Sequence, residues 1–574
     1  MAEVSPTRRP TPLQWLWLLF FLLYLPCLWK PPHIDEESYL FIASEVAHSV
    51  LRPYDWWRPW QPGGDPAAGS FIFAHPPFLL WTLAGEGALT SSVPWLRVLQ
   101  LPWVMLWVLA TFLLARQLTR QVVLTTLFFG VAPAVLLCLH QSLMIDLSAW
   151  ALAFAGWALA REALILPRPS RLNLWAGLCL GAAALTKYPT LLIWIPLLGM
   201  APRTQDPGRW RMIPLIGLGI PLLWQLYTWA VYGTPHLIYV LQHAGEITRA
   251  PLSSRLFGTL AQLGLTVVAP PLLWGALPRR WFLWGGVGAL ALMGLLHWAG
   301  DVLSPTGLVG LVWALVEGSS AGLPSSLSGR LLLGVGWAGG LVLVRAALYH
   351  GLRGETLDKG LARAFLLTVG GVVLSHNFIG GRYLVLPGLL ATLLLCRLSE
   401  RNQGVGRWRR AGGWSVALSM ALALAVAWAD LRWARVYPGL VAQVDIYVQE
   451  QQPEGKGPFD AMGRPSQVSE TWWYTGEWGL RYQADQRGWT NLLLGKPKVG
   501  DWIVTSQYSA PGVLPAGVVL AWTLPAPSSL LKTQAPAAGI GFYSEVFGLL
   551  PYGFAPGPLD VLEIYRVTGD HSTP

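Results

Sequence analysis

Residues 13–29, LQWLWLLFFLLYLPCLW, form an uncharged apolar run, and the stretch KPPHIDEESYLF that follows from Lys30 sets three carboxylates side by side. An apolar run of this kind approaches the roughly 20 residues that cross a bilayer as a helix. The tail before it carries Arg8 and Arg9, as a signal peptide does, but no A-x-A-like cleavage site follows it. We therefore interpret residues 13–29 as a retained first transmembrane helix.

The composition of the whole chain agrees with a membrane location. The chain has 574 residues, of which 53% are hydrophobic and 12% charged, and its mean hydropathy is +0.44. Further apolar runs are expected to span the membrane at 95–115, 121–139, 148–165, 172–186, 189–201, 212–232, 257–277, 281–298, 327–346, 364–380, 383–397 and 412–430. The sequence thus predicts a polytopic α-helical membrane protein with about 13 transmembrane helices.

The placement of Lys and Arg predicts the orientation in the membrane. Basic residues gather in the N-terminal tail and in alternate short connections, for example at 116–120, 203–211 and 397–410. Because connections rich in Lys and Arg stay cytoplasmic, we expect a cytoplasmic N-terminus and an extracytoplasmic C-terminus. The formal charge of +10 is then a signal of topology, and nothing in the pattern suggests a nucleic-acid partner.

Beyond residue 430 the sequence changes character. Gly, Pro and Trp punctuate short alternating runs, of which DWIVTSQY, GVVLAWTL and PLDVLEIYRV are each typical of a strand. We expect residues 1–430 to form a transmembrane module and residues 431–574 a soluble, extracytoplasmic, mixed α/β domain. The four cysteines all lie in predicted spans, which argues against an extracytoplasmic disulfide framework. These residues are Cys27, Cys138, Cys179 and Cys396.

The first outer loop, residues 30–94, is where we expect the chemistry. Its early part places Tyr39, Ile42, Val46 and Val50 on one stripe, as an amphipathic helix lying in the membrane interface requires. The carboxylates of residues 35–37 have two interpretations: Asp35 caps this helix with its acidic neighbours favoured by the helix dipole, or the group is catalytic.

Several motifs, taken in order, resemble GT-C glycosyltransferases of the protein O-mannosyltransferase and lipid A aminoarabinose transferase type, which are family 39-like enzymes. The motifs lie at scattered points between residues 30 and 400, and none is specific alone. They are the Asp-Glu pair after the first span with IASEVA, AHPPF at 74–78, WLRVLQLP, SLMIDLSAW, GAAALTKYPTLLIWIPLL, YGTPH and GGRYLVLPGLL.

The resemblance implies a GT-C fold and a hexosyl- or pentosyltransferase. Such an enzyme moves a sugar from a polyprenyl-phosphate carrier to a lipid, glycan or protein acceptor on the outer face of the membrane. The acceptor hydroxyl must lose a proton, and Asp35 matches the general base of the family. Glu36 would be its catalytic neighbour, orienting Asp35 or the acceptor.

A departing phosphate needs cations, because it gains negative charge at a poorly solvated membrane edge. The resemblance assigns this role to Arg97, Lys187 and Arg382, and to His75, although the aminoarabinose type has Lys at the position of His75. Each has a structural alternative: Arg97 can snorkel from its span, Lys187 can anchor a turn at the interface, Arg382 can pair with an outer carboxylate, and His75 can serve an extended turn before two prolines.

The acceptor or substrate pocket is expected to contain a carboxylate and three phenols. They are Asp146, Tyr39, Tyr188 and Tyr383. Asp146 could instead cap a helix, since an acid at the end of a span must be satisfied or functional. The histidines show no metal-ligand spacing, so we predict no metal site and no certain cofactor, with a divalent cation between phosphate and carboxylates as the alternative.

Two other classes compete with a transferase. A transporter or lipid flippase also uses many spans and a few charges, but it is typically built from inverted repeats with charged sites near mid-membrane. A non-catalytic, acceptor-binding homologue would not need the Asp-Glu pair. Most of the 33 tryptophans fit an interfacial belt, with Trp56, Trp57 and Trp60 of the outer loop as candidates for sugar stacking. The basic N-terminal tail and the resemblance favour a bacterial inner membrane.

Overall fold

A computed structural model gives the arrangement of the chain. It describes residues 11–56, 75–165, 171–200, 207–243, 250–267, 277, 280–281, 283, 286–287, 324, 326–377, 379–403, 405–451, 471–509, 513–544 and 546–569. Trp57 and Trp60, together with most of the predicted span 281–298, lie outside these residues.

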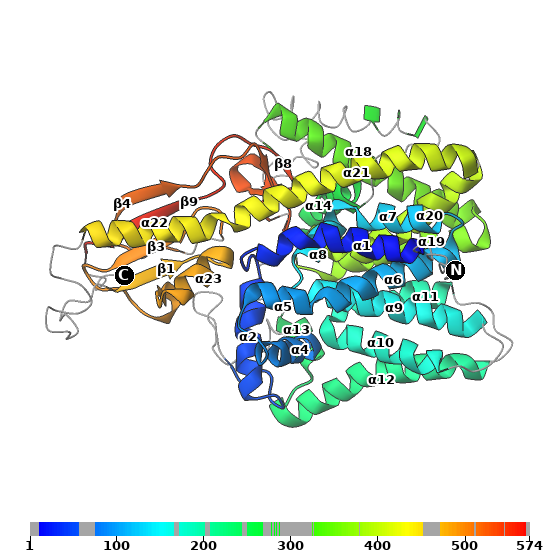
Figure 1. Cartoon of the computed structure of the whole chain (residues 1–574), viewed down its shortest axis with the longest axis horizontal. Helices are drawn as coiled ribbons and strands as arrows, with labels where there is room; N and C mark the ends of the chain where they lie inside the picture. Colours follow the sequence, from blue (N-terminus) through cyan, green and yellow to red (C-terminus); the bar gives the residue numbers. More distant parts are fainter. Residues whose placement is uncertain are drawn as a thin grey trace, which may run out of the picture.

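Helices form the first three quarters of the described chain, and most of the long ones run roughly parallel (Figure 1). In order they are α1 (Pro12–Tyr24), η1 (Leu25–Trp29), α2 (Glu36–His48), α4 (Phe78–Gly87), α5 (Val93–Leu99), α6 (Leu101–Leu118), α7 (Val122–Gly130), α8 (Pro133–His140), α9 (Ile145–Ile165), α10 (Leu172–Thr186), η2 (Tyr188–Ile193), α11 (Trp194–Gly199), α12 (Pro207–Tyr232), α13 (His236–His243), α14 (Leu252–Gln262), η3 (Leu263–Val267), α18 (Leu327–Arg353), α19 (Thr356–Ser375), η4 (Gly381–Leu384), α20 (Val385–Gln403), α21 (Val405–Ala434) and α22 (Val436–Gln451).

Six helical segments in the described chain are long and apolar enough to cross a membrane. They are Pro12–Trp29, Val93–Leu118, Arg211–Tyr232, Leu327–Arg353, Gly381–Asn402 and Gly412–Tyr447. The pair α7 and α8, bent by 68° at its break, makes a seventh if it counts as one span. The protein is thus an integral, multi-pass membrane protein, as predicted. The count of about 13 helices stays a prediction.

The sequence explains where two of the predicted spans break. The run 121–139 divides into α7 and α8 because Pro133 has no backbone N–H to continue the helix and fits the first turn of the next one. The run 189–201 forms the 3-10 turn η2 and the short helix α11, since Lys187 is extended at the end of α10 and Pro189 lies in the first turn of η2.

The helix expected after residue 35 is α2; its place in the membrane interface stays a prediction. Tyr39, Ile42 and Val46 lie on its buried side, with 6%, 3% and 1% of their surfaces exposed. Val50 does not belong to this stripe: the helix ends at His48 and Val50 is 52% exposed. Ser49 leaves the helical conformation, and the next residues turn instead of continuing the apolar face.

The C-terminal domain is built on a five-stranded mixed sheet with the order β2-β1-β3-β9-β4. The strand β1 (Trp472–Thr475) lies parallel to β2 (Thr490–Asn491) and β3 (Trp502–Ser506), and the helix α23 (Trp478–Gln486) connects β1 to β2. β9 (Val561–Val567) is antiparallel to both β3 and β4 (Val518–Pro525). The three strands predicted from the sequence are β3, β4 and β9.

Short strand pairs complete this domain. β5 (Leu531–Lys532) pairs with β8 (Gly553–Phe554), and β6 (Gln534–Ala535) pairs with β7 (Ile540–Gly541). The ring of Tyr447 in α22 contacts Trp522 and Trp502, with centroids 4.3 Å and 6.1 Å away. A helix that leaves the bundle therefore packs on the sheet, and the predicted domain boundary at residue 430 falls inside α21 (Figure 1).

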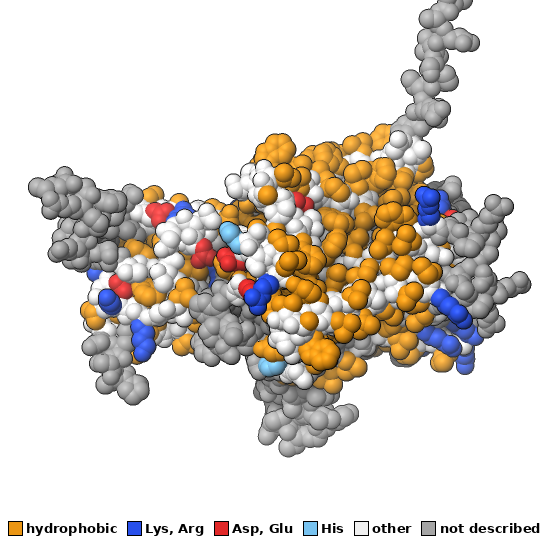
Figure 2. Space-filling view, turned by 90° about the horizontal axis from the view of Figure 1, so that it is seen from below, with side chains coloured by type: hydrophobic (Ala, Val, Ile, Leu, Met, Phe, Trp, Pro, Cys, Tyr) orange, Lys and Arg blue, Asp and Glu red, His pale blue; other side chains and the backbone are white. Residues whose placement is uncertain are grey.

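The surface of the helical part is largely apolar on the face seen in Figure 2. Hydrophobic side chains cover a broad area over the bundle, and Lys and Arg side chains gather at the end away from the C-terminal domain (Figure 2). The four cysteines are unpaired, and three of them are buried. They pack as small apolar side chains.

Asp560 joins the C-terminal domain to α22 and makes the stability of this joint depend on pH. Its buried carboxylate accepts hydrogen bonds from Ser506 Oγ at 2.6 Å and Tyr437 Oη at 2.7 Å. Burial raises the pKa of Asp560 to about 6, against the opposing effect of these donors. Between about pH 4 and pH 6 the native state thus binds more protons than the unfolded chain, so stability falls as the pH rises through this window.

We expect Asp560→Asn to flatten this dependence, since an amide does not ionise. The check is the melting temperature of the detergent-solubilised protein from about pH 4 to about pH 7, followed by tryptophan fluorescence. An unchanged slope in the variant would show that Asp560 is already ionised at pH 5.

Candidate functional site

The candidate site begins at a strained turn between η1 and α2. Ile34 has φ of 55°, a left-handed conformation that is rare for a β-branched residue and costs about 1–3 kcal/mol. This turn places Asp35 and Glu36 at the start of α2, where their side chains find different partners. Asp35 stands at the N-cap position but makes no capping hydrogen bond with its side chain.

Asp35 instead pairs with Arg382, which lies 347 residues later in η4. Arg382 Nη1 donates to Asp35 Oδ2 at 2.8 Å, and Arg382 Nη2 donates to the hydroxyl of Tyr383 at 3.1 Å. The side chain of Asp35 is 31% exposed while that of Arg382 is 10% exposed. Asp35 therefore has the most accessible carboxylate of this group, held by a buried cation.

Two glycines before Arg382 let the C-terminal domain reach this position. A Cβ on Gly380 would meet the carbonyl oxygen of Tyr543 at 2.4 Å, so a side chain there would clash with backbone. Gly381 N donates to the carbonyl of Phe542 at 3.4 Å. The GG of GGRYLVLPGLL thus serves a close approach between η4 and the C-terminal domain, which fixes the turn that carries Arg382.

A second buried ion pair lies beside the first. Lys187, at the end of α10, donates to Asp146 Oδ1 at 2.5 Å, and their side chains are 5% and 3% exposed. The ammonium of Lys187 and the guanidinium of Arg382 lie over the ring of Tyr383, 4.8 Å and 5.1 Å from its centroid. Tyr383 therefore links the two pairs into one group of two cations and two carboxylates.

Two buried polar atoms of this group have no hydrogen-bond partner among the described residues. They are Asp146 Oδ2 and Arg382 Nε. A buried polar atom left unpaired costs about 1–3 kcal/mol, so native structures keep such atoms where a ligand or water completes them. These two atoms are candidates for direct contact with a substrate.

Tyr39 and His75, both from the loop 30–94, lie beside this group of charges. Their rings are 5.9 Å apart and tilted by 32°. Loss of hydration, together with the nearby cation of Lys187, lowers the pKa of His75 to about 3, although part of its side chain is exposed. His75 is therefore neutral at pH 7, and it can offer a hydrogen bond to a phosphate but no positive charge.

Tyr188 does not contact Asp35 or Arg382 directly. Its hydroxyl lies 2.8 Å from His236 Nδ1 and accepts from Gln225 at 2.9 Å. Tyr54 stacks on His236 with centroids 4.7 Å apart and donates to the carbonyl of His75 at 3.2 Å. The sequence did not predict a role for Tyr54, His236 or Gln225. Among these, only His236 belongs to a motif, YGTPH, which places it at the start of α13.

Glu36 and Arg97 form a separate, fully buried pair. Arg97 donates through both terminal nitrogens to the two oxygens of Glu36, at 2.8 Å each, and both side chains are 0% exposed. Arg97 also donates to the carbonyl of Lys30 at 3.1 Å and to Ser142 Oγ at 3.3 Å. Arg97 is thus neither snorkelling nor part of the group around Tyr383, and its donors are occupied by protein.

Lys30 extends this buried network to the C-terminal domain. It donates to Asp430 Oδ2 at 2.6 Å, with side chains 0% and 1% exposed. The hydroxyl of Tyr543 donates to the other oxygen of Asp430 and accepts from Gln141. No sequence motif pointed to this arrangement, because its hydrogen-bonded partners are separated by up to 402 residues.

The described part of the chain contains no group of three or more His, Cys, Asp or Glu side chains that could hold a metal ion. The carboxylates of Asp35 and Asp146 are each paired with a cation, which offers a divalent ion no free carboxylate pair. The absence of a metal from the mechanism stays a prediction.

A group of charges thus lies at the end of a multi-pass helical bundle, where a mixed-sheet domain joins it. No family model matches the chain, and no curated protein sequence matches it.

Solved structures resemble the chain at low identity. It is similar to the crystal structure of ArnT from Cupriavidus metallidurans in the apo state, with a TM-score of 0.34 and 18% identity over 86% of this chain and 93% of that chain. The same protein bound to undecaprenyl phosphate gives a TM-score of 0.35 and 17% identity over the same shares. The arabinofuranosyltransferase AftD from Mycobacteria gives 0.44 and 13%, over 99% of this chain and 40% of that chain. The function of this chain is therefore inferred from its own side chains.

The pair of Glu36 and Arg97 generates a prediction about stability. Arg97→Gln leaves the carboxylate of Glu36 buried and unpaired, which should lower the free energy of unfolding by about 3–5 kcal/mol. The measurement is chemical unfolding of the detergent-solubilised protein. Arg52→Gln is the control, because Arg52 forms an exposed pair with Asp55 in the same loop and should cost less than about 1 kcal/mol.

A stable Arg97→Gln protein that has lost affinity for a polyprenyl phosphate would contradict the structural role and return Arg97 to the donor site.

Proposed function

We propose that this protein is a GT-C membrane glycosyltransferase. It would transfer a hexosyl or pentosyl group from a polyprenyl-phosphate donor to a lipid, glycan or protein acceptor at the outer face of the membrane. The observation that carries the proposal is the convergence of Asp35, Arg382 and Lys187, from distant parts of the chain, around Tyr383. This arrangement supports a base and two cations acting on one phosphate-linked substrate.

In the proposed reaction Asp35 accepts the proton of the acceptor hydroxyl. The acceptor oxygen forms a bond to the anomeric carbon as the bond from that carbon to the phosphate oxygen breaks. The polyprenyl phosphate leaves with the electron pair. Asp35 suits the role because its carboxylate keeps 31% of its surface exposed, so an acceptor can reach it, and general-base catalysis requires direct contact or one bridging water.

The ion pairs of the site support the departure of the phosphate. Before the reaction the cation of Arg382 is balanced by Asp35 at 2.8 Å. When Asp35 takes the proton it loses its charge, while the phosphate changes from a diester to a monoester and gains one. The charge of Arg382 thus becomes available as negative charge develops on the leaving group, and the unpaired Nε of Arg382 supplies a donor for it.

The other predicted residues take supporting roles in this proposal. Lys187 would hold the donor phosphate from the far side of Tyr383, and His75 would add a neutral hydrogen bond. Asp146, Tyr39, Tyr188 and Tyr383 would line the space for the sugar and the acceptor. Glu36 would act through Arg97 as a positioning residue, because its buried pair holds the start of α2 in place.

The transporter alternative fits the structure less well. A transporter needs charged or broken-helix sites near the middle of the bilayer, whereas Asp35 and Arg382 lie in short segments that adjoin the C-terminal domain. α2 lies at that end of the bundle (Figure 1).

For the membrane location we propose a bacterial inner membrane with the N-terminus inside and the C-terminus outside. α1 begins at the end of the bundle opposite the sheet domain (Figure 1). A fluorescent-protein fusion truncated after Arg401 should fluoresce in the cytoplasm, and an alkaline phosphatase fused after Pro574 should be active outside. A dark fluorescent fusion after Arg401, or an inactive phosphatase after Pro574, would overturn the topology.

Asp35→Asn tests the general base. The amide keeps the shape of the side chain, and its oxygen can still accept a hydrogen bond from Arg382, but it cannot take a proton. Turnover should therefore fall by about 10² to 10⁴ in a protein that remains folded. The assay uses polyprenyl-phosphate sugars extracted from cells and follows the release of free polyprenyl phosphate by mass spectrometry, in detergent and without a gradient.

Asp55→Asn is the matched control, because Asp55 lies in the same loop, is exposed and pairs only with Arg52 among the described residues. Its turnover should equal that of the unmodified protein. Normal turnover by Asp35→Asn would exclude Asp35 as the base and move the role to another carboxylate, with Asp146 the next candidate.

A further inference from the structure

The helix that leaves the bundle is longer than a membrane requires. The segment Gly412–Tyr447 contains 36 residues, about 54 Å of helix at 1.5 Å per residue, whereas the hydrocarbon core is about 30 Å thick. If the segment enters the bilayer near Gly412, it leaves near residue 432. Figure 1 shows α21 continuing through α22 to the sheet domain.

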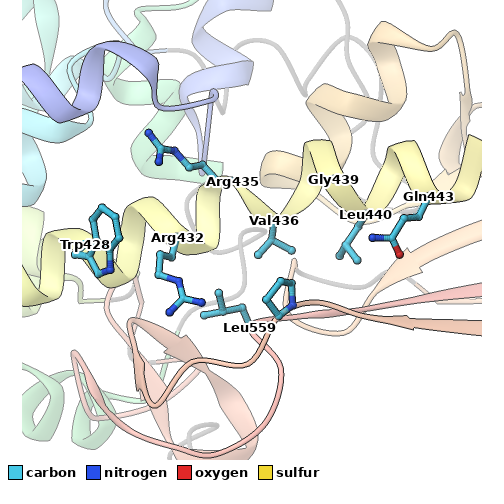
Figure 3. A pocket seen from close by; sticks show the side chains of 9 residues that line it. Trp428, Arg432, Arg435, Val436, Gly439, Leu440, Gln443 and Leu559 are labelled. Atoms are coloured by element: carbon cyan, nitrogen blue, oxygen red, sulfur yellow. The ribbon is translucent and has the colours of Figure 1, made fainter.

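A pocket of about 380 Å³ lies near residue 432, between the helix and two loops of the C-terminal domain. Its volume is in the range of small-molecule sites. Its lining consists of Trp428, Arg432, Arg435, Val436, Gly439, Leu440, Gln443, Pro527 and Leu559. Arg432, Val436 and Leu440 point from one side of the helix toward the loop of Leu559, and Arg435 rises from another side (Figure 3).

The lining combines positive charge with apolar surface. It contains two arginines and no carboxylate. Arg432 Nη2 donates to the carbonyl of Ser528 at 3.3 Å, and neither Arg432 nor Arg435 pairs with an acid within the described residues. Trp428, one turn nearer the membrane than Arg432, is 58% exposed, as a side chain of the interfacial belt is.

We propose that this pocket binds the headgroup of an anionic glycerophospholipid from the outer leaflet. The phosphate would lie on Arg432, and Arg435 would add to the positive potential at the rim. The glycerol and the first acyl carbons would lie along Val436, Leu440 and the exposed ring of Trp428. The calculated exit point of the helix puts the pocket at headgroup level, where a lipid can enter sideways and where basic pockets between helices bind anionic headgroups.

The bound lipid would act on the joint between the two parts of the protein. The pocket walls come from α21 and α22 on one side and from Pro527 and Leu559 on the other, so an occupant contacts both. A ligand that binds only the assembled state stabilises it. The lipid would therefore hold the C-terminal domain against the helix, and its site shares no residue with the group around Tyr383.

The test uses the full-length protein, delipidated in detergent and mixed with phosphatidylglycerol, phosphatidylcholine or inorganic phosphate. Phosphatidylglycerol should raise the melting temperature and remain bound in native mass spectrometry, while the other two should do neither. In Arg432→Gln the apparent affinity for phosphatidylglycerol should fall about tenfold or more, because a charge-assisted bond to the phosphate is lost. Lys496→Gln, an exposed side chain of the same domain outside the pocket, is the control for net charge.

Gly439→Phe provides a second variant that keeps both arginines. A Cβ at Gly439 would meet nothing within 4 Å, so the ring can fill the pocket without a clash and should also abolish lipid binding. Gly413 lies in α21, in the same segment Gly412–Tyr447, and has equally open surroundings, so Gly413→Phe should bind like the unmodified protein. Stabilisation by inorganic phosphate alone, equal stabilisation by phosphatidylcholine, or full lipid binding by Arg432→Gln and Gly439→Phe would each overturn the proposal.

Discussion

The buried pair of Glu36 and Arg97 is the interaction on which the candidate site depends. Two unit charges with no solvent exposure persist in a protein interior only when each is matched and hydrogen-bonded. Arg97 meets this requirement by binding both oxygens of Glu36 and the carbonyl of Lys30. The segment between Lys30 and Glu36 is thereby held at both ends, and the strained conformation of Ile34 persists between them. Asp35 owes its position facing Arg382 to this constraint.

Much of the architecture could be predicted from the composition and from the spacing of apolar residues along the chain. The transmembrane runs follow from apolar length, and the strands β3, β4 and β9 follow from alternating side chains between Gly and Pro. The extension of α21 beyond residue 430 could not be predicted in the same way. The polar positions Asp430, Arg432 and Arg435 end the apolar pattern, but they do not end the helix. Asp430 is neutralised by Lys30, and the two arginines are not buried.

The candidate site was predicted in part. Asp35, Lys187, Asp146, Arg382 and Tyr383 were chosen from motifs, and the structure brings them together. Which residue pairs with which could not be predicted from the spacing of residues, because ion pairs between distant residues produce no regular pattern in a sequence. In the sequence, an aspartate at a helix start can be either a helix cap or a catalytic base. The structure shows that the Asp35 side chain makes no capping hydrogen bond and instead accepts one from Arg382.

The convergence itself depends on a part of the chain that carries no motif. Phe542 and Tyr543 contact η4 beside Arg382 and complete the partners of Asp430, so the C-terminal domain belongs to the environment of the site. In the sequence motifs, only Gly380 and Gly381 indicate this contact. Because they have no side chains, the backbone of Phe542 and Tyr543 can pack against them.

The ion pair of Lys30 and Asp430 can form only late in the synthesis of the chain. Its partners are 400 residues apart, and a ribosome that adds about 5–20 residues per second makes the second some 20–80 s after the first. Through that interval Lys30 has no Asp430 to pair with, and Tyr543 is made later still. The end of the first helix next to Lys30 therefore lacks this partner while most of the chain is made, and the site acquires its final surroundings only when synthesis is nearly complete.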